Sequence, residues 1–279
     1  MTYDAHIHIA LDGADWRAAL VRHANGASEQ AVRETLAAYA AVGATYLRDG
    51  GDKCGASLLA ARMAPEYGIS FASPGFALHP AGCYGGFLGR AFASLNEYKR
   101  LVDEAAAAGA TFVKIMLTGI MDFERFGVLL GGDGLPAAQV NALVEYAHNQ
   151  GFSVMAHVNG ARAVRDALEA GVDSVEHGFY LDAATCHDLA QSGALWVPTF
   201  APVRAQAAAH PSPVIERILA LHEENMARVL EEGGLVACGT DAGSGGVPHA
   251  NSLVNEASLL SSEAHSRALA SLRAKFPGA

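Results

Sequence analysis

The 279-residue sequence predicts a single-domain α/β protein of the (β/α)8 TIM-barrel class. Short apolar runs typical of strands alternate with helical patterns along the whole chain, which indicates parallel βαβ units. Eight such units can be counted, which favours a closed barrel over an open doubly wound sheet. Connections from helix to strand are short, whereas three connections from strand to helix are long. In a barrel these long connections share the C-terminal face, where active sites lie.

The individual elements follow from the periodicity of apolar residues along the chain. Strands are expected at residues 3–10, 44–47, 69–72, 111–117, 152–157, 172–177, 195–199 and 235–241. Helices are expected at residues 29–42, 56–67, 95–108, 136–150, 161–170, 183–192 and 213–232, with a last helix from residue 251. Pro136 near the start of one helix and Gly151 just after its end are typical boundary residues. The long connections are expected at residues 73–94, 118–135 and 200–212.

The composition is that of a globular protein and limits the classes of partner. Hydrophobic residues make up 51% and charged residues 17%, and a formal net charge of -10 argues against a nucleic-acid or membrane partner. The four cysteines form no CxxC pair, which is typical of thiols in a reducing compartment. No signal sequence and no apolar run of ~18 residues is recognisable, so we expect a cytoplasmic protein. A homo-oligomer is compatible with the sequence.

Polar residues collect at the ends of the predicted strands. His6 and His8 alternate along the first strand and therefore share one of its faces. Taken alone, such a pair could equally be two core histidines, so further ligands must decide. The other strands supply them, namely Lys114, His157, His177 and Asp241. Because a barrel brings the strand ends together, these side chains predict a site for zinc or a neighbouring transition metal.

These motifs resemble those of the amidohydrolase superfamily. The segments 4–8 (DAHIH), 112–116 (FVKIM), 156–157 (AH), 175–178 (VEHG) and 239–243 (GTDAG) look like its five signature strands in the right order. Residues 47–51 (LRDGG), and residues 247–249 (VPH) with Glu256, are similar to its imidazolonepropionase and Xaa-Pro dipeptidase-like branch. The resemblance covers nearly the whole chain. It implies one amidohydrolase-type barrel domain over residues 1–279, without the small β-sandwich domain that members of the branch usually carry.

The resemblance also implies roles for the strand-end residues. His6, His8 and Asp241 would hold a buried metal ion, and His157 and His177 a second, more exposed one. Lys114, carboxylated by carbon dioxide, would bridge the two divalent ions, for which zinc is favoured. Asp241 would be the catalytic residue that takes a proton from the metal-activated hydroxide and passes it to the leaving amine.

A metal-dependent hydrolase that cleaves an amide-type C–N bond in a small molecule is therefore the function we expect. The long connections are rich in apolar residues and contain Arg125 and Arg204, which could bind an anion. An N-acyl amino acid or a dipeptide would fit both features, with His249, Tyr84 and His79 as further candidate substrate contacts. The alternatives are a lactonase or phosphoesterase on the same site, a mononuclear decarboxylase or isomerase, and a non-enzymatic metal-binding or scaffold protein.

Overall fold

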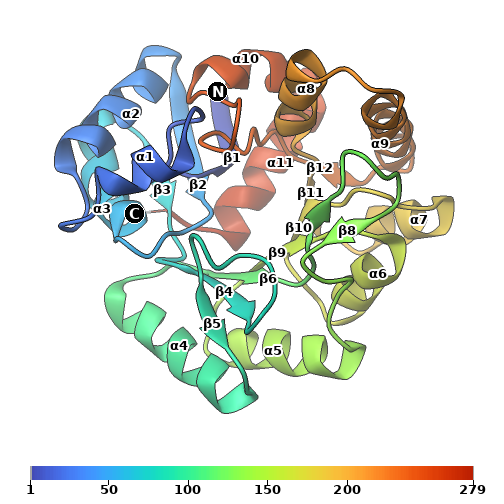
Figure 1. The fold of residues 1–279 in the computed structure, drawn as a ribbon, viewed down its shortest axis with the longest axis horizontal. Coiled ribbons are helices and arrows are strands. Elements are labelled where there is room, and N and C mark those ends of the chain that lie inside the picture. The colour runs from blue at the N-terminus through green and yellow to red at the C-terminus, as the bar shows by residue number, and fades with distance from the viewer. Residues whose placement is uncertain (1, 279) are drawn as a thin grey trace.

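The computed structural model describes residues 2–278, in which parallel strands lie inside a ring formed by most of the helices (Figure 1). The eight strands expected from the sequence are all present. They are β1 (Thr2–Ile7), β2 (Ala44–Asp49), β3 (Ser70–Ala72), β6 (Val113–Met116), β9 (Val154–Val158), β10 (Ser174–His177), β11 (Leu195–Val197) and β12 (Leu235–Val236). Parallel strands with surrounding helices are the basis of a TIM-barrel-like α/β fold.

Strand pairing divides these strands between two parallel sheets. One sheet has the order β1-β2-β3, and the other has the order β12-β11-β10-β9-β6-β4-β5, where β4 (Ala77–Pro80) and β5 (Arg90–Phe92) are additional strands. The strand pairings of residues 2–278 therefore do not form one continuous closed sheet. Backbone hydrogen bonds nevertheless join the two sheets. The nitrogen of Ala5 donates to the oxygen of Cys238 at 2.9 Å, and the nitrogen of Thr111 donates to the oxygen of Ser73 at 2.8 Å.

Most helices begin and end near the predicted residues. They are α1 (Trp16–Val21), α2 (Glu29–Ala41), α3 (Ala56–Met63), the short 3-10 helix η1 (Ala64–Tyr67), α4 (Leu95–Ala108), α5 (Ala137–Asn149), α6 (Ala161–Glu169), α7 (Ala183–Gln191), α8 (Phe200–Ala209), α9 (Pro213–Glu231), α10 (Asn251–Ala257) and α11 (Ser262–Lys275). Helix α4 shows why such boundaries can be predicted. The Ser94 side chain accepts a hydrogen bond from the nitrogen of Glu97, and Gly109 ends the helix in the left-handed conformation.

The long connections differ from the sequence prediction. Residues 200–212, expected as a loop, contain α8, and the last helical region is divided into α10 and α11. Helix α8 was not predicted because its apolar and polar residues are not separated onto two faces. The connection after β3 contains β4 and β5, and the connection after β6 contains an antiparallel pair, β7 (Ile120–Met121) and β8 (Leu129–Leu130). Helix α1 was not expected either.

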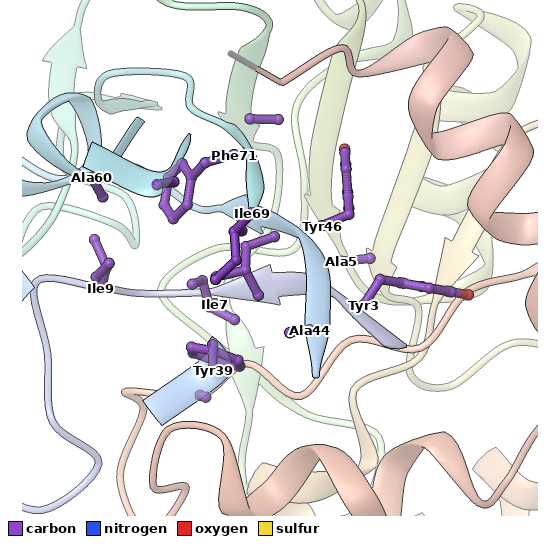
Figure 2. Close-up of a cluster of buried hydrophobic side chains, with 14 of the residues drawn as sticks. Tyr3, Ala5, Ile7, Ile9, Tyr39, Ala44, Tyr46, Ala60, Ile69 and Phe71 are labelled. Carbon is purple, nitrogen blue, oxygen red and sulfur yellow. The ribbon is translucent and has the colours of Figure 1, made fainter. Parts of the chain in front are cut away.

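The apolar face of β1 is anchored in a buried cluster. Figure 2 shows Ala5 and Ile7 of β1 among Tyr39 of α2, Tyr46 of β2 and Ile69, and all five side chains are buried. Burying one Ile side chain contributes about 1.5–3 kcal/mol, so this packing fixes which face of the strand points outward. Because side chains alternate, the opposite face with its two histidines must point inward. No helix among residues 2–278 is long and apolar enough to span a membrane.

Candidate metal centre

A cavity of about 460 Å³ opens at the C-terminal ends of the strands. All six residues that the sequence predicted as metal ligands line it. We call these six residues the candidate metal centre; they are His6, His8, Lys114, His157, His177 and Asp241. They come from β1, β6, β9, β10 and the segment after β12, so residues far apart in the chain meet at one place.

Three of these residues form a compact group of potential ligands. In the described chain, His6, His8 and Asp241 each offer one ligand atom, and these atoms lie within 4.8 Å of one another. The Oδ1 atom of Asp241 lies 3.1 Å from Nε2 of His8 and 3.7 Å from Nε2 of His6. Two imidazole nitrogens and a carboxylate oxygen at this spacing suit a divalent metal such as zinc.

Gly50 makes room for the His8 ring. A Cβ atom at position 50 would lie 2.3 Å from Cε1 of His8, so any side chain there would displace the imidazole. The Nδ1 atom of His8 is buried and has no hydrogen-bond partner among the described residues. Gly50 directly follows β2 within the LRDGG segment, and its contact with His8 explains why a small residue is needed at this point of the chain.

His157 and His177 form a second pair beside the first group. Their ring centroids are 4.5 Å apart. A protein oxygen holds one nitrogen of each ring, since Nε2 of His157 lies 3.1 Å from the carbonyl oxygen of Gly119 and Nδ1 of His177 lies 2.7 Å from Oγ1 of Thr199. Burial, with a further contribution from Lys114, lowers the pKa of His157 to about 3. The neutral imidazole that results is the form that binds metals.

Unusual backbone geometry directs several residues at the cavity. His177, Thr199 and Asp241 have φ angles of 67°, 52° and 55°, in the left-handed region that residues other than glycine rarely adopt. Such conformations cost about 1–3 kcal/mol each and occur mainly at functional sites. A hydrogen bond of 2.7 Å from the nitrogen of Asp241 to the oxygen of His6 holds one of these turns in place. Three of the five non-glycine residues with positive φ among the described residues therefore belong to the candidate metal centre or contact it; the other two are Tyr180 and Ala250.

Among the described residues, Lys114 is the member of the centre whose side-chain amine lacks a hydrogen-bond partner. Its Nζ atom is buried and has no hydrogen-bond partner among residues 2–278. Burial lowers the pKa of Lys114 to about 8; Glu176 opposes this shift and Arg48 adds to it. A buried ammonium without a partner is costly, so a neutral amine or a chemical modification is favoured at this position.

The sequence reasoning missed a buried ion pair behind His6. Oε2 of Glu176 lies 2.7 Å from Nδ1 of His6, and Oε1 accepts hydrogen bonds from Nη2 of Arg48 at 2.7 Å and from Oγ of Ser174 at 2.6 Å. Although burial alone would raise the pKa of Glu176, Arg48 and His6 lower it to about 2. An ionised Glu176 favours a proton on Nδ1 of His6, which leaves Nε2 free to bind a metal. Charged residues inside apolar strand segments were the available sequence signal.

The five predicted substrate contacts have different surroundings. Tyr84 lines the cavity, with its ring centroid 5.2 Å from that of His157. The other four do not line it, and each has a protein partner. These contacts are His79 with the oxygen of Pro80, Arg125 with Asp122, Arg204 with Glu223, and His249 with the oxygen of Leu11. The structure thus brings one of the five to the cavity, and substrate binding by the others stays a prediction.

Imidazoles, a carboxylate and a buried amine at the ends of parallel strands are typical of the metal-dependent enzymes with a TIM-barrel-like fold. The comparison with known families makes this class specific. The model of the amidohydrolase family matches residues 2–274, so the chain belongs to this family, which is generally metal-dependent. The family resemblance deduced from the strand motifs is therefore confirmed.

Individual relatives are more distant. The ochratoxinase of Aspergillus niger is 27% identical over 164 residues, which is 54% of this chain and 33% of that protein. The chain therefore spans about a third of the length of the curated relatives it matches. A Xaa-Pro dipeptidase with bound methionine superposes with a TM-score of 0.76 at 18% identity, covering 98% of this chain and 75% of the other. The crystal structure of the A. niger ochratoxinase superposes with a TM-score of 0.71 at 21% sequence identity. The superposition covers 90% of this chain and 64% of the other. These likenesses show a shared fold.

Proposed function

We propose that this protein hydrolyses an amide-type C–N bond of a small molecule at a binuclear metal centre. The observation that supports it most strongly is the buried Lys114 amine without a partner, in the same cavity as four histidines and Asp241. In this proposal His6, His8 and Asp241 hold one divalent ion, and His157 and His177 hold the other. Nitrogen and carboxylate ligands of this kind favour zinc.

Lys114 would connect the two ion sites after reaction with carbon dioxide. Its neutral amine would form an N–C bond with carbon dioxide and release one proton to water, which would convert a potential cation into a carbamate carboxylate. That change removes an unpaired amine from a buried position and adds two oxygen ligands between the histidine groups. The burial that lowers the pKa of Lys114 supports this reaction, because the amine must be neutral to attack.

Asp241 would transfer the proton during hydrolysis. Two bound divalent ions would polarise the scissile carbonyl group and acidify the attacking water. Although burial alone would raise the pKa of Asp241, its contact with His8 and the nearby His6 lower it below the ordinary value. The carboxylate is therefore ionised at neutral pH. It can accept the proton of the attacking water and pass it to the leaving nitrogen.

The dipeptidase neighbour supports a peptide-type C–N bond, and the apolar walls of the cavity support a substrate with a bulky apolar group. The N-acyl amino acid or dipeptide expected from the sequence has such a bond, but it also carries a carboxylate that needs a partner. The arginines that we expected to bind a substrate carboxylate are instead paired with acidic residues outside the cavity lining.

Metal analysis and a substrate screen test the proposal together. Purified protein, loaded with zinc in the presence of carbon dioxide, should contain two ions per chain, lose activity with a chelator and regain it with zinc. It should hydrolyse members of an amide library and not the matched lactones or phosphoesters. One ion per chain in fully active protein would overturn the binuclear centre. Activity confined to lactones or phosphoesters would overturn C–N bond cleavage.

A further inference from the structure

We propose that Trp16, Tyr84 and Phe87 form an aromatic wall that selects amide substrates with an uncharged aromatic group over substrates that carry a carboxylate. This inference names the substrate class of the hydrolysis proposed above and rests on that proposal. The wall is made of two segments far apart in the chain. Trp16 begins α1, whereas Tyr84 and Phe87 lie between β4 and β5.

The three rings form a continuous series that leads to the candidate metal centre. Ring centroids are 5.7 Å apart between Trp16 and Phe87, 5.9 Å between Phe87 and Tyr84, and 5.2 Å between Tyr84 and His157. Trp16 is 41% exposed, whereas His157 is only 3% exposed, so the series runs from solvent to the buried ligands. All four residues line the cavity.

The geometry of these rings suits an added aromatic group. Their planes are inclined to one another by 58°, 56° and 36° along the series, so the rings present both faces and edges. Aromatic groups prefer tilted or offset contacts at centroid distances of ~4.5–7 Å, and such contacts add to the energy of simple burial. A substrate ring beside Phe87 would leave the scissile bond near His157.

The charges around the cavity do not favour a carboxylate. Apart from the histidines, Lys114 is the one basic side chain among the described residues that line it, and Lys114 belongs to the metal centre. Two other cations lie near the wall but outside the lining. The Arg17 guanidinium lies 4.3 Å from the centroid of the Trp16 ring, and the Lys53 amine donates to the oxygen of Gly86. A carboxylate against the wall would lose hydration, and the described residues that line the cavity beside the three rings offer it no cationic side chain in return.

Three ligands that differ in one feature each test the inference. N-ethylphenylacetamide is the neutral aromatic amide, phenylacetylglycine replaces its terminal methyl group by a carboxylate, and N-ethylcyclohexylacetamide replaces its aromatic ring. For zinc-loaded protein, we expect kcat/KM for the neutral aromatic amide to exceed that for phenylacetylglycine by about tenfold or more. It should exceed that for the cyclohexyl compound about threefold to tenfold.

Two substitutions test whether the rings of the wall cause the preference for aromatic substrates. Trp16→Leu and Phe87→Leu keep an apolar side chain but remove a ring, and each should reduce the preference for the aromatic over the cyclohexyl compound to less than twofold. Val21→Ala is the matched control, because Val21 lies on the same helix α1, is 71% exposed and does not line the cavity. A second control, Arg17→Gln, should leave the low activity on phenylacetylglycine unchanged.

A binding measurement separates this inference from the proposed function. Trp16 is partly exposed and Trp196 is fully buried, so excitation at the red edge of the tryptophan band should report mainly on Trp16. Ligands that bind at the wall should shift this emission. The measurement uses metal-free protein, which does not turn over substrate. A saturable blue shift with the neutral aromatic amide but not with phenylacetylglycine supports the wall even if no amide is hydrolysed. If phenylacetylglycine is bound and hydrolysed as well as the neutral aromatic amide or better, the proposed selectivity of the wall is wrong. The proposed hydrolysis of amides would still stand. If Trp16→Leu does not fold, Phe87→Leu and the wild-type ligand series still decide.

Discussion

The floor of the cavity and its walls are built in different ways. The floor consists of side chains at the ends of strands, and protein partners orient several of them, as Glu176 does for His6 and Thr199 for His177. The walls come from α1, from the connection between β4 and β5, and from α8. Chemistry needs precise distances, which strands supply, whereas substrate choice can change with the surrounding segments.

This difference predicts that changes in the floor affect metal content and kcat, while changes in the walls affect the choice of substrate. Lys114→Ala should give the largest effect, because two cations would then face each other without a bridging anion. We expect loss of at least one metal ion and of nearly all activity, with the fold retained by circular dichroism. Metal analysis checks this result, and Lys99→Ala on α4 is a control outside the cavity.

Added formate or acetate sharpens the same experiment. A short carboxylic acid could occupy the space left by Lys114 and restore part of the metal content and activity of Lys114→Ala. An ion-pair role for Lys114 predicts no such rescue, because the acid would bring a negative charge where a positive one was lost. Native mass spectrometry that finds unmodified Lys114 in active, metal-loaded protein would contradict the bridge.

Asp241→Asn should have the second-largest effect. The amide oxygen can still bind a metal, but it cannot accept a proton at neutral pH. We expect kcat to fall about 100-fold or more, the scale of lost general-base catalysis, with a smaller change in metal content. Steady-state kinetics with parallel metal analysis measures both. Unchanged turnover with the metals bound would remove Asp241 from proton transfer.

Glu176→Gln tests the part of the floor that lies behind the ligands. Gln keeps the size of the side chain but removes the charge that orients His6 and neutralises Arg48. Loss of such a partner typically weakens metal binding about 10–100-fold, which a competition titration with a chromogenic chelator can measure. The control is Glu104→Gln, which removes a partner of Arg90 at the exposed surface. Equal metal affinities in the two variants would mean that Glu176 only stabilises the fold.

The smallest effect concerns the wall helix α8. Glu256 accepts a hydrogen bond of 2.7 Å from the nitrogen of Phe200, and burial raises the pKa of Glu256 to about 8. Because the folded state holds this proton more tightly than the unfolded state, stability should fall as pH rises from about 4.5 to about 8. Glu256→Gln should remove most of this fall, since each unit of difference between the folded and unfolded pKa corresponds to about 1.4 kcal/mol. Urea unfolding of both proteins at pH 5 and pH 9 measures this change in the free energy of unfolding. If the variant keeps the pH dependence of the wild type, Glu256 does not cause it.

Much of the floor was predictable because its signals are local. The alternation of His6 and His8 with Ala5 and Ile7 identifies a strand with one apolar face, and burial of that face in the cluster of Figure 2 turns the histidines inward. Helix α4 was likewise predicted at both ends, because Ser94 and Gly109 are boundary residues in the sequence itself. Strand ends in a parallel barrel-like fold then converge on one side without any further information.

Tertiary structure alone decided which residues surround the substrate space. Arg125 and Arg204 looked like anion-binding residues in long connections, yet each pairs with a nearby acidic side chain outside the cavity lining. Trp16 and Phe87 meet across 71 positions of the chain (87 minus 16), and no local periodicity records such a contact. The sequence determined most of the elements and the candidate ligands at their ends, because period and boundary residues act over a few positions. The walls depend on packing between distant segments, which only the folded chain establishes.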